Sequence, residues 1–123
     1  MSVGEAKIEV WVEEEEDFGA EGPSKRGTLF NVEGGNKGSD VVGETERTDR
    51  PTSEGSAVVT LILRLTGERF PAGTIVAKGA LPYEDGDIRD GHLAITGGTG
   101  AHAGLQGAIR VESWNPKKYS VQP

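Results

Sequence analysis

Cysteine is absent from the sequence, and so is any long apolar run. Without cysteine the chain can form no disulfide framework and offers no thiolate as a nucleophile. No stretch approaches the roughly 18 apolar residues of a membrane-spanning helix. The N-terminal stretch "MSVGEAKIEVWV" also lacks the apolar region of a secretory signal. We therefore expect a cytoplasmic protein with no membrane partner.

Basic residues are outnumbered, because 13 Lys and Arg stand against 20 Asp and Glu and give a formal net charge of −7. A field of that sign opposes nucleic acids and anionic lipid surfaces. Histidine is also scarce, and neither His92 nor His102 has carboxylates at a spacing that would make a metal site. We therefore expect no nucleic-acid partner and no catalytic metal.

Glycine, by contrast, is abundant, with 19 residues in a chain of 123. Because glycine is about 1 kcal/mol less favourable than alanine inside a helix, this composition disfavours long helices and suits tight turns. Alternating residues, as in "KIEVWV", and short β-branched runs, as in "AVVTLILRL", predict strands instead. The predicted strands cover residues 7–12, 27–32, 41–47, 57–65, 74–81, 92–96, 105–114 and 118–122.

About eight short strands separated by polar loops are typical of an antiparallel sandwich or a barrel. Closing the sheet removes its exposed edges, which favours the barrel. Eight strands leave an interior that is filled by side chains or is just wide enough for one small ligand. We therefore predict a single all-β domain over residues 1–123, folded as an eight-stranded antiparallel β-barrel.

The glycine-rich stretch "TGGTGAHAG", residues 96–104, follows an apolar strand as a nucleotide-binding loop would. A dinucleotide-binding loop must open a helix, and a P-loop needs Gly-Lys-Ser/Thr. Here "LQGAIRVESW" follows, with Ile109 and Val111 at strand spacing, and no Gly-Lys-Ser/Thr occurs. We interpret the glycines as a connection between two strands.

"YED" at residues 83–85, followed by "LAITGGTG", a small insert and a last long strand, carries a family resemblance. This segment, residues 73–112, resembles the allene oxide cyclase family and, more loosely, the plant dirigent proteins. The resemblance implies an allene oxide cyclase-like, calycin-like barrel with a cavity along its axis, assembled into a homo-oligomer such as a dimer or trimer. Bacterial relatives of this barrel fold reactive polyketide chains and close rings by [4+2] or spiro-ring formation.

The catalytic positions of the resembling family carry over only in part. The plant cyclases place a Glu and an Asn two residues apart on the first strand, where this chain has Val12 and Glu14. Leu81 stands where they have a tyrosine, and Asp49 stands nearest to their cavity cysteine. The resemblance therefore implies the scaffold with a different pocket chemistry, and not allene oxide cyclisation itself.

The scarcity of catalytic side chains and the resemblance together favour a cofactor-free cyclase or isomerase for a hydrophobic, polyketide-type intermediate. A snug apolar cavity can hold a near-attack conformer and exclude water. Glu14 continues the face of Val10 and Val12, so it is a candidate base or orienting group, and Tyr83 is a candidate hydrogen-bond donor. The predicted substrate-binding residues are Val10, Val12, Leu61, Leu63, Ile75, Ala77, Leu81 and Trp114.

Blander interpretations stay open for each of these residues. Glu14 also belongs to the acidic run 13–17, Tyr83 could simply pack in its loop, and Arg47 and Arg64 are interpreted as surface cations. The protein could be a dirigent-like or lipocalin-like barrel that binds a small apolar ligand without catalysis, or an oligomeric barrel with a filled interior. A pocket of at least about 300 Å³ would separate the ligand-binding hypotheses from the last one.

Overall fold

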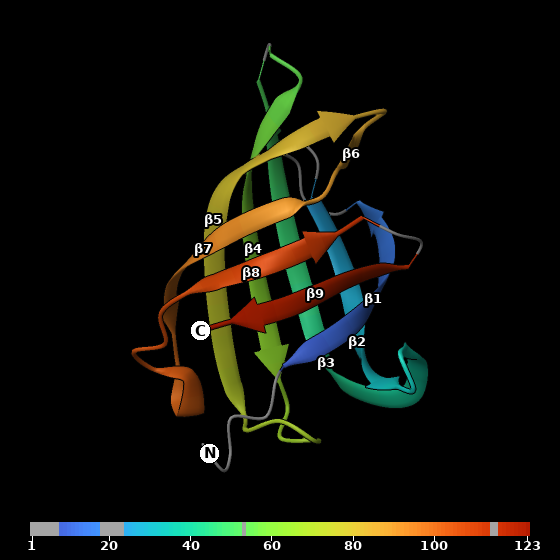
Figure 1. Ribbon diagram of the computed structural model, residues 1–123, viewed down its shortest axis with the longest axis vertical. Helices are drawn as coiled ribbons and strands as arrows, with labels where there is room; N and C mark the ends of the chain where they lie inside the picture. The colour runs from blue at the N-terminus through green and yellow to red at the C-terminus, as the bar shows by residue number, and fades with distance from the viewer. Residues whose placement is uncertain (1–7, 18–23, 53, 114–115) are drawn as a thin grey trace.

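The computed structural model describes residues 8–17, 24–52, 54–113 and 116–123, and most of them belong to β-strands (Figure 1). The strands are β1 Glu9–Asp17, β2 Ser24–Glu33, β3 Asn36–Pro51, β4 Ser56–Leu65, β5 Gly73–Glu84, β6 Asp87–Ile88, β7 Gly91–Gly98, β8 Ala108–Glu112 and β9 Lys117–Gln122. A 3-10 helix, η1, covers Gly100–His102. Among the described residues, no helix has the length and apolar character that crossing a membrane requires.

The strands form one antiparallel sheet that closes on itself. Hydrogen-bonded neighbours follow the order β4-β3-β2-β1-β9-β8-β7-β5, and β4 also pairs with β5 along its whole length. This last pairing closes eight strands into a barrel, with β7, β8 and β9 on the near side of Figure 1 and β3 and β4 behind them. β6 is only two residues long and forms a short hairpin with the end of β5. The predicted eight-stranded antiparallel barrel is therefore confirmed.

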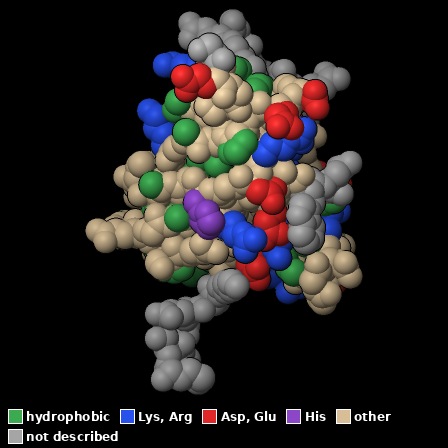
Figure 2. Space-filling view, turned by 45° about the horizontal axis from the view of Figure 1, so that its top comes forward, with side chains coloured by type: hydrophobic (Ala, Val, Ile, Leu, Met, Phe, Trp, Pro, Cys, Tyr) green, Lys and Arg blue, Asp and Glu red, His purple; other side chains and the backbone are tan. Residues whose placement is uncertain are grey.

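Alternation along each strand decides what lies inside the barrel. In β4, every second residue from Ala57 to Leu65 is buried, and the residues between them are only half-buried. The side chains of a strand point to opposite faces in turn, so one face lines the interior. Burying each Val, Leu or Ile side chain stabilises the fold by about 1.5–3 kcal/mol. On the outer face seen in Figure 2, acidic and basic side chains lie beside one another and the hydrophobic ones are dispersed.

β3 is much longer than the sequence predicts, and the difference lies in its polar ends. Residues 33–40 were expected to form a loop, yet the chain reverses at Gly34 and Gly35 alone, and β3 begins at Asn36. Both glycines have positive φ angles, 57° and 82°, which a two-residue hairpin turn requires. At its other end β3 runs on to Pro51, because polar residues continue the ladder with β4.

The glycine-rich stretch joins two strands, as the sequence analysis predicts. β7 ends at Gly98, η1 makes a single 3-10 turn, and β8 begins at Ala108. Gly98 lies so close to the carbonyl oxygens of His102 and Thr74 that a Cβ there would overlap them. Glycine is therefore needed for close backbone packing, and the α-helix that a dinucleotide-binding loop opens is not formed here.

Candidate functional site

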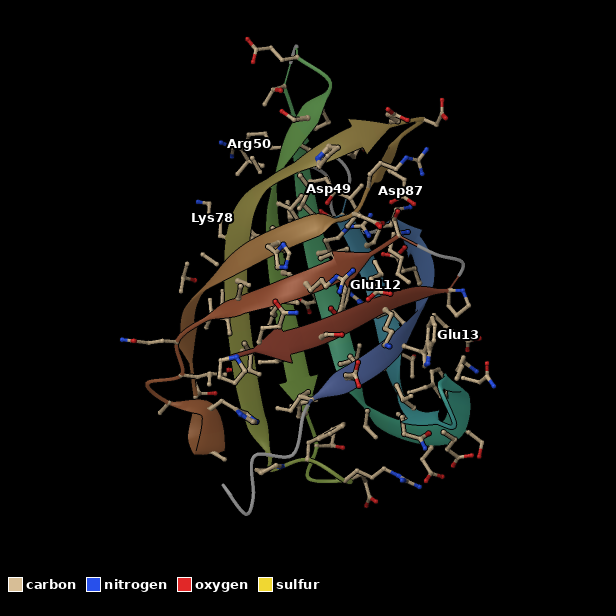
Figure 3. All side chains as sticks on the ribbon, viewed as in Figure 1. Glu13, Asp49, Arg50, Lys78, Asp87 and Glu112 are labelled. Carbon is tan, nitrogen blue, oxygen red and sulfur yellow. The ribbon has the colours of Figure 1, made fainter. Side chains whose placement is uncertain are left out.

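Five charged side chains converge inside one end of the barrel, and we call them the charged cluster. Glu14 comes from β1, Arg47 and Asp49 from β3, Asp87 from β6 and Lys117 from β9. Figure 3 shows Asp49 and Asp87 at the same end of the barrel. Strand parity explains the arrangement, since each of these residues on the long strands continues a face that points inward.

Arg47 lies at the centre of the charged cluster and is only 1% exposed. Its guanidinium donates two parallel hydrogen bonds to the Asp49 carboxylate, at 2.9 Å from Nε and 3.0 Å from Nη2. It also donates to Glu14 at 2.5 Å and to Asp87 at 3.0 Å. Burial alone would lower the pKa of Arg47, but Tyr119 and the carboxylates around it raise that pKa above its usual value. The interpretation of Arg47 as a surface cation is wrong.

Lys117 completes a ring of ion pairs with Arg47. Its Nζ donates to Glu14 Oε1 at 2.9 Å and to Asp87 Oδ2 at 2.6 Å. The second carboxylate oxygen of Glu14 and that of Asp87 each accept a hydrogen bond from Arg47. Both carboxylates therefore bridge the two cations. The pairing of Val12 with Lys117 in the β1–β9 ladder brings Lys117 next to Glu14 on the same inner face.

The carboxylates of the charged cluster differ in their proton affinity. Burial raises the pKa of Asp49, and the hydrogen bond and charge of Arg47 offset only part of that rise. Burial also acts on Asp87, but the hydrogen bond and charge of Lys117, together with Arg47, bring the pKa of Asp87 below its usual value. Neighbouring acids whose pKa values are pushed apart are typical of sites that perform acid–base chemistry.

Tyr119 lies beside Arg47 and is completely buried. Among the described residues, no group meets full hydrogen-bond geometry to its hydroxyl, although the Arg47 guanidinium lies close enough to act on it as a donor. Burial raises the pKa of Tyr119, and the positive charge of Arg47 offsets only part of the rise, so the phenol keeps its proton. Buried polar groups nearly always have a partner, and a hydroxyl without one needs an explanation. Tyr119 is not among the residues predicted from the sequence, although Lys117, Tyr119 and Val121 alternate in the same way as the inward residues of β1.

The two residues predicted to be catalytic lie at this same end of the barrel. Glu14 points inward, with 17% of its side chain exposed, so it does not belong to a fully solvated acidic face. Tyr83 is half-buried against the core, and its hydroxyl donates to the Gly86 carbonyl at 3.0 Å. Burial and the charge of Asp49 raise the pKa of Tyr83. Their catalytic roles stay predictions.

The predicted substrate-binding residues occupy the apolar part of the interior. Trp114 lies outside the described residues. The others are at most 1% exposed and pack together in one core: Val10, Val12, Leu61, Leu63, Ile75, Ala77 and Leu81. A side chain without exposed surface contacts no space that holds a water molecule. The hollow expected along the axis is therefore absent at these seven residues, and their binding role stays a prediction.

A cavity of about 340 Å³ lies at the opposite end of the barrel. It is lined by Glu9, Asn31, Val32, Arg69 and Phe70, none of which was predicted to bind substrate. Its polar groups are already engaged. Arg69 donates to Asp40, Asn31 donates to Glu33, and Glu9 pairs with Lys118 at 3.2 Å. The polar groups of the charged cluster are also engaged, but Arg47, Asp49 and Lys117 are buried and the Tyr119 hydroxyl beside them lacks a partner, whereas Arg69 and Asp40 are about half exposed. We therefore take the charged cluster as the better candidate site.

Metal binding has little support in the described part of the chain. No group of three or more His, Asp or Glu residues there is placed to hold a metal ion. The three carboxylates of the charged cluster surround Arg47 and Lys117, which already occupy the cation positions. The expectation that no metal or cofactor takes part stays a prediction.

The fold and the site together define the class of protein: a closed eight-stranded antiparallel barrel with a ring of ion pairs inside one end. No family model and no curated protein matches the sequence. A solved structure, that of a pyocyanin demethylase, is similar over 95% of this chain and 98% of its own, with a TM-score of 0.65. At 21% sequence identity this likeness shows the fold. The resemblance to allene oxide cyclases stays a prediction.

Proposed function

We propose that this protein converts a small organic molecule at the charged cluster, as a cofactor-free isomerase or cyclase. The burial of the charged cluster carries the proposal: Arg47 is fully buried within a ring of ion pairs, with the Tyr119 hydroxyl beside it. Buried ion pairs are weak stabilisers, and well-packed apolar residues of similar volume often serve a fold as well or better. A barrel that needed only a core would gain little from this cluster. A barrel that must bind a polar group would need it.

The similar solved structure supports a small molecule as the substrate. Its name describes an enzyme that demethylates pyocyanin, so a barrel of this fold can act on a small molecule. Fold alone does not fix the reaction. We therefore infer the type of reaction from the charged cluster, and from the comparison we infer only that the substrate is a small molecule.

The chemistry we propose is a proton transfer within the bound molecule. The Tyr119 hydroxyl and the Arg47 guanidinium would hold a carbonyl oxygen of the substrate and the negative charge that develops on it. Glu14 would remove a proton from the neighbouring carbon and return it elsewhere on the same molecule, which isomerises the substrate without a cofactor. The family resemblance favours ring closure of a polyketide-type chain. A spiro ring would form when the carbanion left by this proton transfer attacks a second carbon of the same chain and the proton then returns to the product. A [4+2] closure transfers no proton and would need only the carbonyl oxygen held at Arg47. Tyr83 would assist as a second donor at the mouth once its hydroxyl turns from the Gly86 carbonyl oxygen to the substrate.

A structural barrel with a filled interior is a second candidate, because the seven apolar residues predicted to bind substrate contact no empty space. A barrel that binds an apolar ligand without converting it is a third. The three functions differ in what happens to an added molecule. An enzyme converts the added molecule, a carrier binds it unchanged, and a structural barrel does not bind it.

Product analysis tests the proposed function. The purified protein is incubated with pyocyanin, linear polyenes and small conjugated ketones, and the products are identified by chromatography with mass spectrometry. Removing a general base typically lowers the rate by about 10²–10⁴-fold, so Glu14→Gln should lose conversion to that extent. Arg69→Gln, at the opposite end of the barrel, should leave it unchanged. Conversion that survives Glu14→Gln, or binding without conversion, would contradict the proposal.

A further inference from the structure

Asp87 differs from the other two carboxylates of the charged cluster in its place and exposure. It lies on β6, a strand of two residues, whereas Glu14 and Asp49 belong to strands of 9 and 16 residues. Its side chain is 33% exposed, compared with 17% for Glu14 and 0% for Asp49. Asp87 therefore forms the outer wall of the cluster, and a molecule arriving from solvent meets it before Arg47.

The carboxylate of Asp87 spans two cations in the way that a ligand carboxylate would. Oδ1 accepts from Arg47 at 3.0 Å and Oδ2 accepts from Lys117 at 2.6 Å. Neither cation depends on Asp87 for a partner. Arg47 keeps Asp49 and Glu14, and Lys117 keeps Glu14. One carboxylate could therefore replace the other without leaving a buried charge unpaired, which is the costly outcome in such clusters.

The backbone around Asp87 allows the exchange without opening the barrel. The next residue, Ile88, is fully buried in the core, and its N–H donates to Asp87 Oδ1 at 2.9 Å. Rotation of the Asp87 side chain toward solvent breaks that local hydrogen bond and the two ion pairs, while Ile88 keeps its place. The Arg47 and Lys117 donors would then face the incoming molecule, with the Tyr119 hydroxyl beside Arg47.

We propose that Asp87 is an internal substitute for the carboxylate of a small-molecule ligand, and that the ligand carboxylate displaces it from Arg47 and Lys117. This inference deepens the proposed function, because it gives the substrate of the same site a chemical class: an organic carboxylate. A neutral ligand would leave two donor groups with weaker partners, since hydrogen bonds between charged groups are roughly twice as strong as neutral ones. A planar carboxylate also presents one oxygen to each cation, as Asp87 does.

The test compares benzoate, benzamide and inorganic phosphate as probes by isothermal titration at low salt. The Asp87→Ala protein should bind benzoate at least about tenfold more tightly than the unmodified protein, the factor expected when an internal group fills the site for about nine-tenths of the time. Benzamide, which has the same ring without the charge, should gain nothing. Phosphate should gain less than benzoate. An equal gain for benzamide, a larger gain for phosphate or no gain for benzoate would overturn the proposal.

Asp85→Asn is the matched control for Asp87→Ala. Asp85 lies on the same hairpin, its side chain is 95% exposed, and it pairs with Arg89 at 3.5 Å. This variant removes a neighbouring negative charge and should leave benzoate affinity within about twofold of the original, because exposed ion pairs contribute little. A gain equal to that of Asp87→Ala would mean that benzoate responds only to the overall charge, and would contradict the displacement.

A measurement on the unmodified protein covers the case in which Asp87→Ala does not fold. The ¹³C signal of the Asp87 carboxyl group should move toward that of a solvated aspartate as benzoate is added, and an unchanged signal at saturation would refute displacement. The outcome is independent of turnover, since benzoate is only a probe. Displacement without conversion of any substrate would remove the enzyme proposal alone, and conversion without displacement would remove this inference alone.

Discussion

Arg47 is the residue through which most of the charged cluster is connected. It donates hydrogen bonds to Asp49, Glu14 and Asp87, and only 1% of its side chain is exposed. Removing it would leave Asp49, whose side chain has no exposed surface, without its partner. The loss of stability depends on burial, because water cannot solvate a charge that loses its partner inside a protein.

Arg47→Met should therefore lower the free energy of unfolding by about 3–5 kcal/mol, the range measured when one member of a buried ion pair is removed. Arg64→Met is the matched control, because Arg64 is 42% exposed and pairs with Glu46 on the outer face. It should cost no more than about 1 kcal/mol. Urea unfolding of both variants checks the difference. Equal losses would mean that the charged cluster is solvated.

Asp87 should give stability that depends on pH in one direction. The pKa of Asp87 is lowered in the folded protein, below its ordinary value of 3.8. As the pH falls, the unfolded chain therefore takes up the proton first, so the stabilisation is present above pH 3.8 and is lost as the pH falls through the folded pKa. The difference in unfolding free energy between the original protein and Asp87→Asn should shrink at acid pH. A difference that is constant from pH 6 to pH 3, or that grows, would contradict the assignment.

Some residues of the charged cluster could be predicted from the sequence, and others could not. Parity along "IEVWVEE" placed Glu14 on the inner face after Val10 and Val12, and the structure agrees. The same parity in β3 sets Thr45, Arg47 and Asp49 on one face, but a run of polar residues reads as the solvent side of a strand. Only the register, which sets Arg47 opposite Leu61, reveals that this polar face points inward.

At the scale of elements, the connection between β7 and β8 is tightly packed. The backbone of η1 folds back over the end of β7, where Gly98 meets the carbonyl oxygen of His102. The imidazole Nε2 of His102 lies 2.8 Å from the Pro71 carbonyl oxygen and ties this turn to the β4–β5 loop. These contacts leave no room for a side chain at residue 98.

Gly98→Ala should lower the free energy of unfolding by at least about 2 kcal/mol, because the new Cβ would overlap backbone atoms that cannot move independently. Gly97→Ala is the neighbouring control, since a Cβ there meets nothing within 4 Å. It should be neutral or stabilising by up to about 1 kcal/mol, as the unfolded chain loses freedom. Thermal unfolding distinguishes the two variants. A Gly98→Ala protein as stable as Gly97→Ala would show that the turn is loosely packed.

Strand existence was easier to predict than strand length. The apolar cores of β4 and β5 were found because both stretches are rich in β-branched and other apolar residues. The C-terminal ends of β1 and β3 and the start of β2 were missed because polar residues occupy both of their faces where they approach the charged cluster. The start of β3 was missed because it is polar and follows two glycines. Local pattern cannot distinguish such a strand from a loop, and the pairing partner decides it.

For the whole molecule, the closed barrel of eight strands could be predicted from the sequence. The division of its interior into an apolar core and a charged end could not. Closure follows from the number of strands and from the need to protect sheet edges. The contents of the interior depend on which side chains meet across the barrel. Seven residues expected to line a hollow pack against one another, and the polar end carries the candidate site. The expected homo-oligomer stays a prediction, which sedimentation analysis can check.

The central proposal is that a small molecule binds at the charged end of the barrel. The most direct test is a set of ¹H–¹⁵N correlation spectra of the labelled protein, recorded with a library of small aromatic fragments. Fragments that bind should shift the amide signals of Glu14, Ile88 and Tyr119 most. Shifts gathered at Asn31 and Phe70, which line the cavity at the opposite end, or the absence of any shift across the library, would contradict the account.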